Sequence, residues 1–251
     1  MVIDRNRFQG VWNIIRFNWH FYVLAIAIFL VSMVIAYWSK PPWNAILYGI
    51  ASVGLITLSI SLLVSYYVYD QSDLYELPFL PEMEGESLLN VHAGFDEIST
   101  ILIKKYPKIS LSNADFFDSK KHTEISIRRA RKAYLPHAST IWIDTNNLPF
   151  ANQSFDRIII FLAAHEIRKE DERIRFFQEL NRVCKATGTI YVTEHLRDVN
   201  NFAAYTIGAL HFYAHKTWLN SFRQAELKLT NAVNTTPFIT TFMLSPNGNS
   251  Y

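Results

Sequence analysis

Two stretches in the middle of the chain decide the fold: residues 148–167, LPFANQSFDRIIIFLAAHEI, and residues 176–198, FFQELNRVCKATGTIYVTEHLRD. The run at 156–162 is short, apolar and rich in β-branched residues, which is typical of a strand buried on both faces. Residues 169–184 have the apolar spacing of an amphipathic helix, and residues 189–193 resemble a second buried strand. A strand, a helix and a strand in this order predict parallel pairing within an α/β domain.

The same alternation continues on both sides of this segment. Further short strands and helices are expected at residues 87–91, 97–105, 109–114, 123–133 and 140–143. The last stretch, 227–244, alternates Thr and Phe around Pro237 and is expected to form a terminal antiparallel hairpin. The predicted fold class is therefore α/β: a mostly parallel sheet with helices on both faces, occupying residues 87–251.

The N-terminal part of the chain is strongly apolar. Neither residues 17–38 nor residues 41–69 contain Asp, Glu, Lys or Arg. Each run exceeds the roughly 20 helical residues that cross ~30 Å of hydrocarbon. We therefore expect a transmembrane helical hairpin at residues 1–70, with spans at about 17–38 and 43–69, followed by a linker at 71–86. A signal peptide fits poorly because a second span follows at once, and a buried helical pair of a soluble protein is the plainer alternative.

The flanking charges predict how this hairpin is oriented. Arg5, Arg7 and Arg16 precede the first span, whereas the connecting turn has only Lys40. The positive-inside rule then predicts a two-pass membrane protein with both termini and the α/β domain in the cytoplasm. The net charge of +2 gives no electrostatic reason to expect nucleic-acid binding, and the single cysteine, Cys184, excludes a disulfide scaffold.

Ligands of open α/β sheets bind beyond the carboxyl ends of the strands, so the loops that follow the predicted strands contain the candidate site residues. In chain order these loops contain Asn90, His92 and Gly94; Asp115 with Asp118 as a rival; Asp144, Asn146 and Leu148; His165 and Glu166; and Glu194 and His195. His211 and His215 are weaker candidates further along the chain. The histidines lack the spacing of a zinc motif, so no metal is expected.

From residue 87 to residue 198 the sequence resembles the class I S-adenosylmethionine-dependent methyltransferases. The nearest branch is the type 11 group that includes the quinone-biosynthesis methyltransferases. The resemblance rests on an LPF segment, a small loop, SFD, an apolar strand and a histidine. A helix with E-x-x-R-V, a turn, a glycine and another strand follow. It implies a Rossmann-like fold, methyltransferase activity and S-adenosylmethionine as the cofactor.

The resemblance also implies roles for residues of the first loop. The family has an acid and three glycines there, and this chain has Asn90, His92, Gly94 and Asp96 at those positions. Only Gly94 is retained, and a histidine narrows the approach of the cofactor to the backbone. The loop is therefore either a modified cofactor loop or an inactive one.

The loops after the next three strands provide the other implied contacts. Asp115 matches the acid that accepts the ribose hydroxyls, and Asp144 matches the acid that accepts the adenine amine. Asn146 and Leu148 complete the expected cofactor site, although Leu148 is equally well explained as a packing residue. His165 faces the expected transfer site and is the candidate catalytic residue, either as a base or as a substrate contact.

Together, the anchor and the resemblance predict a membrane-anchored methyltransferase. Its expected partners are the lipid bilayer and a lipophilic small molecule: a quinone precursor, an aryl-polyene pigment or a lipid head group. The aromatic segment 201–222 is expected to cover the acceptor or to pack on the core. The basic run 127–132 is expected to be a solvated helix face, with anionic lipid as the alternative. The alternative function is a catalytically silent methyltransferase-like subunit of a membrane complex.

Overall fold

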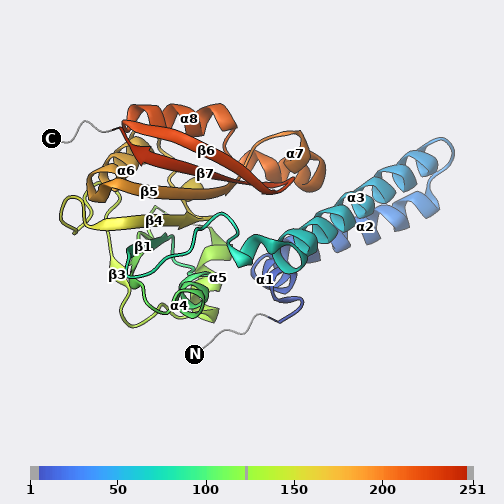
Figure 1. Cartoon of the computed structure of the whole chain (residues 1–251). Coiled ribbons are helices and arrows are strands. Elements are labelled where there is room, and N and C mark those ends of the chain that lie inside the picture. Colours follow the sequence, from blue (N-terminus) through green and yellow to red (C-terminus); the bar gives the residue numbers. More distant parts are fainter. Residues whose placement is uncertain (1–5, 122–123, 248–251) are drawn as a thin grey trace.

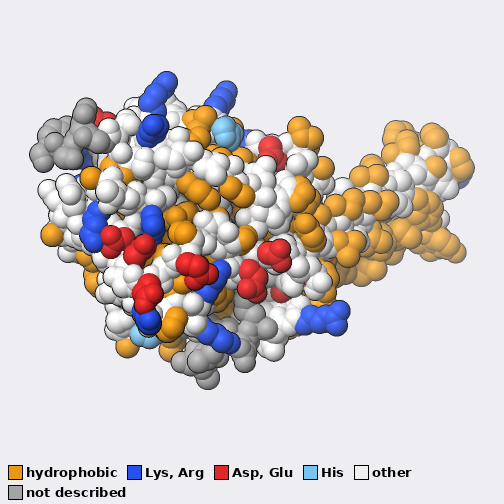
Figure 2. Space-filling model, in the orientation of Figure 1, with side chains coloured by type: hydrophobic (Ala, Val, Ile, Leu, Met, Phe, Trp, Pro, Cys, Tyr) orange, Lys and Arg blue, Asp and Glu red, His pale blue; other side chains and the backbone are white. Residues whose placement is uncertain are grey.

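The structure, a computed structural model, describes residues 6–121 and 124–247. An α/β body carries a helical hairpin that projects from one side of it (Figure 1). The hairpin consists of α2 (Trp19–Trp38) and α3 (Trp43–Tyr66), which pack on each other along their length. Their side chains are mostly apolar and exposed, and hydrophobic atoms cover the projecting part (Figure 2).

A seven-stranded sheet with the order β3-β2-β1-β4-β5-β7-β6 forms the centre of the body. Its strands are β1 (Ser87–His92), β2 (Ser110–Asp115), β3 (Ile141–Trp142), β4 (Phe155–Phe161), β5 (Cys184–His195), β6 (Leu227–Thr236) and β7 (Ile239–Pro246). The first five strands pair in parallel, and β7 lies antiparallel between β5 and β6. This confirms the predicted mostly parallel sheet with a terminal antiparallel hairpin.

Both faces of the sheet are buried, as the apolar run in β4 predicts. Ile158 and Ile160 belong to one core cluster, whereas Ile159 and Phe161 belong to the other. The helices of the body are α4 (Ser99–Lys105), α5 (Ile125–Ala133), α6 (Glu170–Val183), α7 (Val199–Tyr205) and α8 (His215–Gln224). The aromatic segment 201–222 thus contributes to α7, to a 3-10 segment (Thr206–His211) and to α8.

The segment expected to be a linker, residues 71–86, packs onto the body. It contains a 3-10 turn (Asp73–Glu76), and the side chains of Leu74, Leu77 and Phe79 are buried in the second core cluster. These apolar residues alternate with acidic residues and prolines, which is why the sequence suggested a tether. Their burial attaches the end of α3 firmly to the sheet.

A short helix that the sequence did not predict, α1 (Gln9–Phe17), precedes the hairpin. Asp70 lies in the π-helical turn that follows α3 (Tyr67–Gln71), and its side chain accepts hydrogen bonds from the backbone N–H groups of Gly10 (2.6 Å) and Val11 (2.8 Å). A carboxylate at a helix N-terminus satisfies free N–H groups and interacts favourably with the helix dipole. Asp70 therefore links the two ends of the N-terminal segment and places α1 against the body.

Candidate active site

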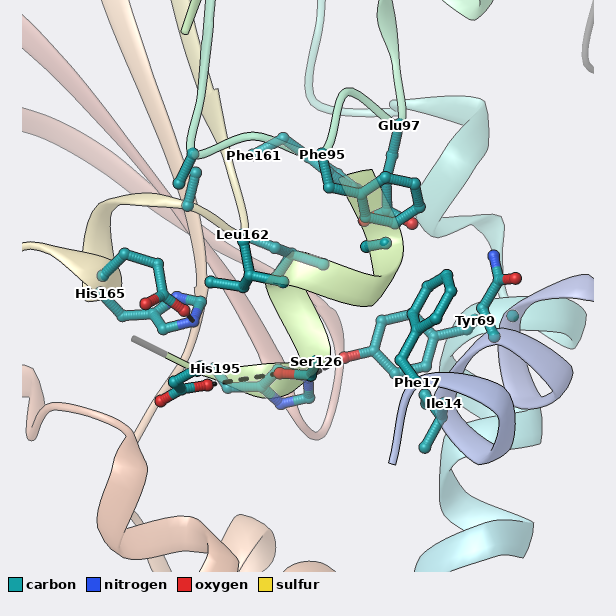
Figure 3. Close-up of a pocket in the computed structure, with 18 of the residues that line it drawn as sticks. Ile14, Phe17, Tyr69, Phe95, Glu97, Ser126, Phe161, Leu162, His165 and His195 are labelled. Carbon is teal, nitrogen blue, oxygen red and sulfur yellow. Dashed lines mark hydrogen bonds and ion pairs between the residues drawn. The ribbon is translucent and has the colours of Figure 1, made fainter. Parts of the chain in front are cut away.

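A cavity of about 290 Å³ lies between α1 and the carboxyl ends of the parallel strands. Figure 3 shows Ile14, Phe17 and Tyr69 on one side of it and His165 and His195 on the other. The lining includes Asn13, Ile14 and Phe17 from α1 and Ala93, Phe95, Phe161, Leu162, His165, Glu166 and His195 from the strand ends. The N-terminal segment therefore forms part of the wall of a cavity that includes His165, whereas Asn90, His92, Gly94 and Asp115 do not line this cavity.

Asp115, the residue expected to accept ribose hydroxyls, ends β2 and is fully buried. One carboxylate oxygen accepts the N–H of Phe117 at 2.8 Å, and the other accepts Nη1 of Arg131 at 2.6 Å. The Arg131 guanidinium also stands over the rings of Phe117 and Trp142, at 4.4 and 4.8 Å from their centroids. An arginine from α5 thus occupies the position beside this carboxylate.

The loop after β1 has the backbone form of a cofactor loop. Gly94 has φ +88°, and a Cβ there would lie 2.6 Å from Nη1 of Arg131 and 3.1 Å from Cβ of Phe117. Asn90 donates from its amide to Asp96 at 3.0 Å, so these two residues hold the loop together. The side chain that lies over Gly94 is therefore that of Arg131.

The imidazole of His92 is buried beside this loop. Neither ring nitrogen has a hydrogen-bond partner among the described residues, and Nδ1 lies 3.8 Å from a carboxylate oxygen of Asp115. Burial lowers the pKa of His92, although the carboxylates of Asp96 and Asp115 oppose that shift. His92 is therefore a neutral side chain at physiological pH, packed under the loop.

The residues after β3 lie further out. Asp144 is exposed and accepts hydrogen bonds from the backbone N–H of Asn146 (2.7 Å) and from its side-chain amide (2.9 Å). These hydrogen bonds lower the pKa of Asp144, so it is ionised at neutral pH. Leu148 is buried in the core, and its N–H donates to Glu179 at 2.8 Å. These three residues do not line the 290 Å³ cavity.

The site fits a nucleoside only after Arg131 moves. A carboxylate at the tip of β2, a glycine with positive φ and two aromatic rings are suitable partners for a ribose and a flat base. The guanidinium of Arg131, which is also flat and donates hydrogen bonds, contacts Asp115 and the two rings where a ribose and a base would otherwise contact them. These residues therefore fit S-adenosylmethionine, and Arg131 competes with the cofactor for contact with them.

His165 follows β4 and lies in a network of carboxylates. Its Nδ1 contacts Oε2 of the fully buried Glu194 at 2.7 Å, and its backbone N–H donates to Oε1 of the same residue at 3.1 Å. Its Nε2 lies 3.2 Å from Oε1 of Glu166. Burial lowers the pKa of His165, but Glu194 and Glu166 outweigh burial and raise this pKa to about 10. The ring is therefore an imidazolium at neutral pH.

His195, at the end of β5, connects the site to the hairpin. Its Nε2 is 2.7 Å from the hydroxyl of Tyr69, and its Nδ1 is 2.8 Å from Oδ1 of Asn201. Burial lowers the pKa of His195 to about 4, so the ring is neutral at physiological pH. This contact joins the segment that follows α3 to the sheet.

Of the two remaining candidates, one lines the cavity and the other is exposed. His211 lines the cavity at the end of the 3-10 segment, whereas His215 begins α8 and packs against Phe242. Sequence reasoning missed Arg131 and Glu124, which both face the site from the region of α5. The basic run on α5 was the available signal, but only the fold shows which of its side chains turn inward.

Comparison with known proteins agrees with this geometry. Residues 119–192 match the family described as Methyltransferase domain. Demethylmenaquinone methyltransferase from Thermotoga maritima is 30% identical over 138 residues, 55% of this chain and 55% of that protein. The chain thus spans about half the length of this curated relative.

Solved methyltransferases share the fold. An S-adenosylmethionine-dependent methyltransferase from Aquifex aeolicus has a TM-score of 0.54 at 15% identity, covering 75% of this chain and 97% of that one. Geranyl diphosphate C-methyltransferase from Streptomyces coelicolor A3(2) has a TM-score of 0.51 at 11% identity, covering 73% and 82%. The α/β part of the chain therefore has the Rossmann-like fold of S-adenosylmethionine-dependent methyltransferases, and residues 119–192 match their family model.

Proposed function

We propose that the protein is a membrane-anchored methyltransferase that transfers a methyl group from S-adenosylmethionine to a lipophilic acceptor. The observation that carries the proposal is the composition of the cavity wall. Ile14 and Phe17 come from the helix next to the anchor, and His165 comes from the strand ends where chemistry is expected. A molecule in this cavity would contact α1, which precedes the hairpin, and the strand ends together (Figure 3).

The hairpin supports the membrane part of the proposal. Two helical stretches are long and apolar enough to cross a bilayer: Trp19–Trp38 and Trp43–Glu76. In each of them, only 6% of an apolar 18-residue stretch is buried. The core helix of a soluble protein would be mostly buried, and an apolar surface of this size in water needs a covering partner. A bilayer is the proposed partner, and it would confine the enzyme and a lipid-soluble acceptor to one surface.

The charges around the hairpin give its proposed orientation. Arg7 and Arg16 lie on the side of the body, and Lys40 lies alone at the tip between the two helices. The proposal therefore places both termini and the α/β body in the cytoplasm. Protease added to inside-out vesicles should digest the body, and protease added to intact cells should leave it whole. The reverse pattern would contradict this topology.

We assign a role to each residue of the proposed site. Bound S-adenosylmethionine supplies the methyl group. Asp115 accepts the ribose hydroxyls after Arg131 leaves, Gly94 allows close approach of the backbone, and Asp144 lies further out for the base. His165 contacts the polar head of the acceptor and thereby positions it for in-line transfer. The name of the curated relative makes a quinone precursor the first acceptor to test.

Cofactor binding can be measured by calorimetric titration of the detergent-solubilised chain with S-adenosylhomocysteine. We expect micromolar binding that Asp115→Asn weakens by at least about tenfold, because the ribose then loses charge-assisted hydrogen bonds. Glu84→Gln is the matched control, since Glu84 is exposed and forms an ion pair with the equally exposed Lys108. Equal affinity for S-adenosylhomocysteine in the natural protein and both variants would contradict the proposed cofactor site.

One observation favours a second function. Arg131 already satisfies the buried Asp115, as a side chain would in a domain that has lost its cofactor. The second candidate is therefore a catalytically silent subunit of a membrane complex. Absence of detectable binding at millimolar S-adenosylhomocysteine, both in the natural protein and after Arg131→Ala, would favour that function.

A further inference from the structure

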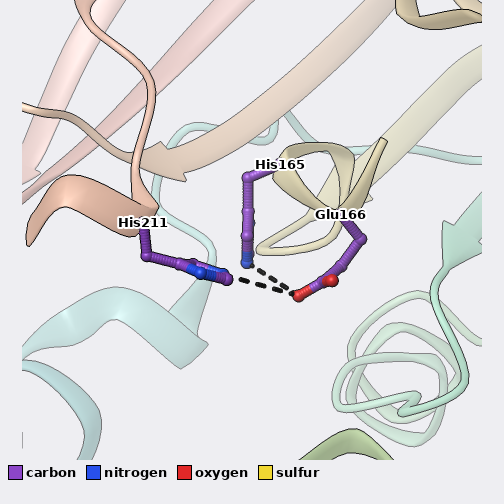
Figure 4. A group of neighbouring side chains, drawn as sticks. All are labelled: His165, Glu166 and His211. Atoms are coloured by element: carbon purple, nitrogen blue, oxygen red, sulfur yellow. Dashed lines mark ion pairs between the residues drawn. The ribbon is translucent and has the colours of Figure 1, made fainter. Parts of the chain in front are cut away.

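Three side chains converge at the cavity wall in a way that the sequence spacing does not suggest. His165 and Glu166 lie on the 3-10 turn after β4, and His211 ends the 3-10 segment that precedes α8 (Figure 4). Oε1 of Glu166 is 3.2 Å from Nε2 of His165 and 3.8 Å from Nε2 of His211. One ligand atom from each residue lies within 4.8 Å of the other two.

A second layer of carboxylates supports both rings. Glu194 Oε2 lies 2.7 Å from Nδ1 of His165, and Glu124 Oε1 lies 3.2 Å from Nδ1 of His211. A metal-binding histidine commonly donates its other ring N–H to a carboxylate, which fixes the tautomer and the orientation of the ring. Here both histidines have such a carboxylate at Nδ1, and both direct Nε2 toward Glu166.

We propose that these residues bind a divalent transition-metal ion, with Nε2 of His165, Nε2 of His211 and a carboxylate oxygen of Glu166 as its ligands; the ion displaces the proton from Nε2 of His165, which is released to solvent. Two imidazoles and one carboxylate suit zinc-like ions better than magnesium or calcium, which prefer all-oxygen sites. Bonds of about 2.0–2.1 Å in a tetrahedral site separate ligand atoms by about 3.4 Å. The distances of 3.2 and 3.8 Å bracket that spacing.

All three ligands line the 290 Å³ cavity, so the fourth position of the ion faces it. Three protein ligands with an open position are typical of a site that binds water or substrate. An ion here would bind an oxygen of the acceptor; that role rests on the proposed function, whereas metal binding itself does not.

A neighbouring arginine competes with the ion. Nη2 of Arg168 lies against the ring nitrogens of His211 and 3.5 Å from Oε1 of Glu124, and Nη1 donates to the backbone oxygen of His211 at 2.7 Å. The side chain of Arg168 is 41% exposed, so it can turn into solvent when a cation binds. Removing this positive charge should therefore strengthen metal binding.

Metal binding is tested on the full chain in detergent, freed of metal with a chelator and titrated with Zn²⁺ by calorimetry. Co²⁺ serves as a second probe, because its visible absorption reports the coordination geometry. The variants are His211→Ala, which removes a ligand, Glu124→Gln, which removes a supporting carboxylate, and Arg168→Ala. His137→Ala is the matched control, since His137 is exposed and bonds to Ser139 instead.

We expect one equivalent of Zn²⁺ per chain and a tetrahedral Co²⁺ spectrum. His211→Ala should abolish both, Glu124→Gln should weaken binding by about 10- to 100-fold, and Arg168→Ala should strengthen it. His137→Ala should bind as the natural protein does. A cooperative thermal unfolding transition in the same samples shows that the variants are folded, and this control does not depend on the proposed function. No Zn²⁺ binding, or equal binding by His211→Ala, would overturn the proposal and leave a network of ion pairs.

Discussion

Nη1 of Arg131 lies 2.6 Å from Oδ2 of Asp115, in a pair whose carboxylate is fully buried and whose arginine side chain is 19% exposed. Asp115 ends β2, which lies between β3 and β1, whereas Arg131 comes from α5, outside the sheet. The same helix contacts α1, since Arg129 donates to the backbone oxygen of Phe17 at 2.6 Å. The proposed cofactor site and the N-terminal segment are therefore joined through one short basic helix.

Arg131→Ala should increase the affinity for S-adenosylhomocysteine. A hydrogen bond to a charged group contributes about 1.5–3 kcal/mol, so removing the competing donor should tighten binding by about tenfold or more. Calorimetric titration measures the change, with Arg128→Ala as a control because Arg128 is an exposed residue of the same helix. Weaker binding after Arg131→Ala would mean that the arginine supports the cofactor instead of competing with it.

Stability should fall when the pH drops below the ordinary pKa of histidine. Burial holds the pKa of His195 near 4, although the hydrogen bond from its ring to Asn201 opposes that shift. The unfolded chain takes up this proton near pH 6.5, so stability is full above that pH and is lost progressively toward pH 4, by roughly 3 kcal/mol. The midpoint of thermal unfolding, plotted against pH over this range, should change less steeply for His195→Gln than for the natural protein. His137→Gln should change as steeply as the natural protein. Parallel curves for all three proteins would contradict this assignment.

The contact between Tyr69 and His195 should stabilise the junction of hairpin and body. Tyr69→Phe leaves Nε2 of the buried His195 without this partner, at a cost of about 1–3 kcal/mol. Tyr37→Phe is the control, because Tyr37 is 74% exposed at the end of α2. The midpoint of thermal unfolding should fall for the first variant and stay constant for the second. An unchanged midpoint for Tyr69→Phe would show that the hydrogen bond contributes nothing.

Gly10→Ala should loosen α1 from the body. A Cβ at Gly10 would lie 2.4 Å from Cβ of Tyr69, so the helix must shift and its bonds to Asp70 must weaken. Overpacking of this kind costs about 1–3 kcal/mol. At Gly49 in α3 an added Cβ meets nothing within 4 Å, so Gly49→Ala should leave stability equal or higher. Limited proteolysis should cut the first variant faster, and equal rates would contradict the close packing.

The sequence predicted the architecture because local patterns determine it. The apolar, β-branched run in β4 belongs to a strand buried on both faces, and the charge-free stretches became α2 and α3. Two candidates from the strand-end loops, His165 and His195, line the cavity.

The rest depends on contacts between distant parts of the chain. The bond between Asp70 and α1 joins residues 59 and 60 positions apart, and no local pattern indicates it. Arg131 belongs to a run that resembles a solvated face, yet it turns inward to a buried carboxylate. His165 and His211 meet only because the fold brings the loop after β4 beside the 3-10 segment before α8. Spacing along the chain therefore gave no sign of a metal site.

Transfer of a labelled methyl group tests the central claim most directly. The purified chain in phospholipid vesicles that contain demethylmenaquinone chemically reduced to its quinol is incubated with S-adenosylmethionine labelled in its methyl group, and the lipids are then extracted. We predict that label enters the lipid fraction with the natural protein and with Glu84→Gln, and that Asp115→Asn reduces the rate at least about tenfold. Label that enters the lipid at the same rate with Asp115→Asn, or that never leaves the aqueous phase with the natural protein, would contradict the claim.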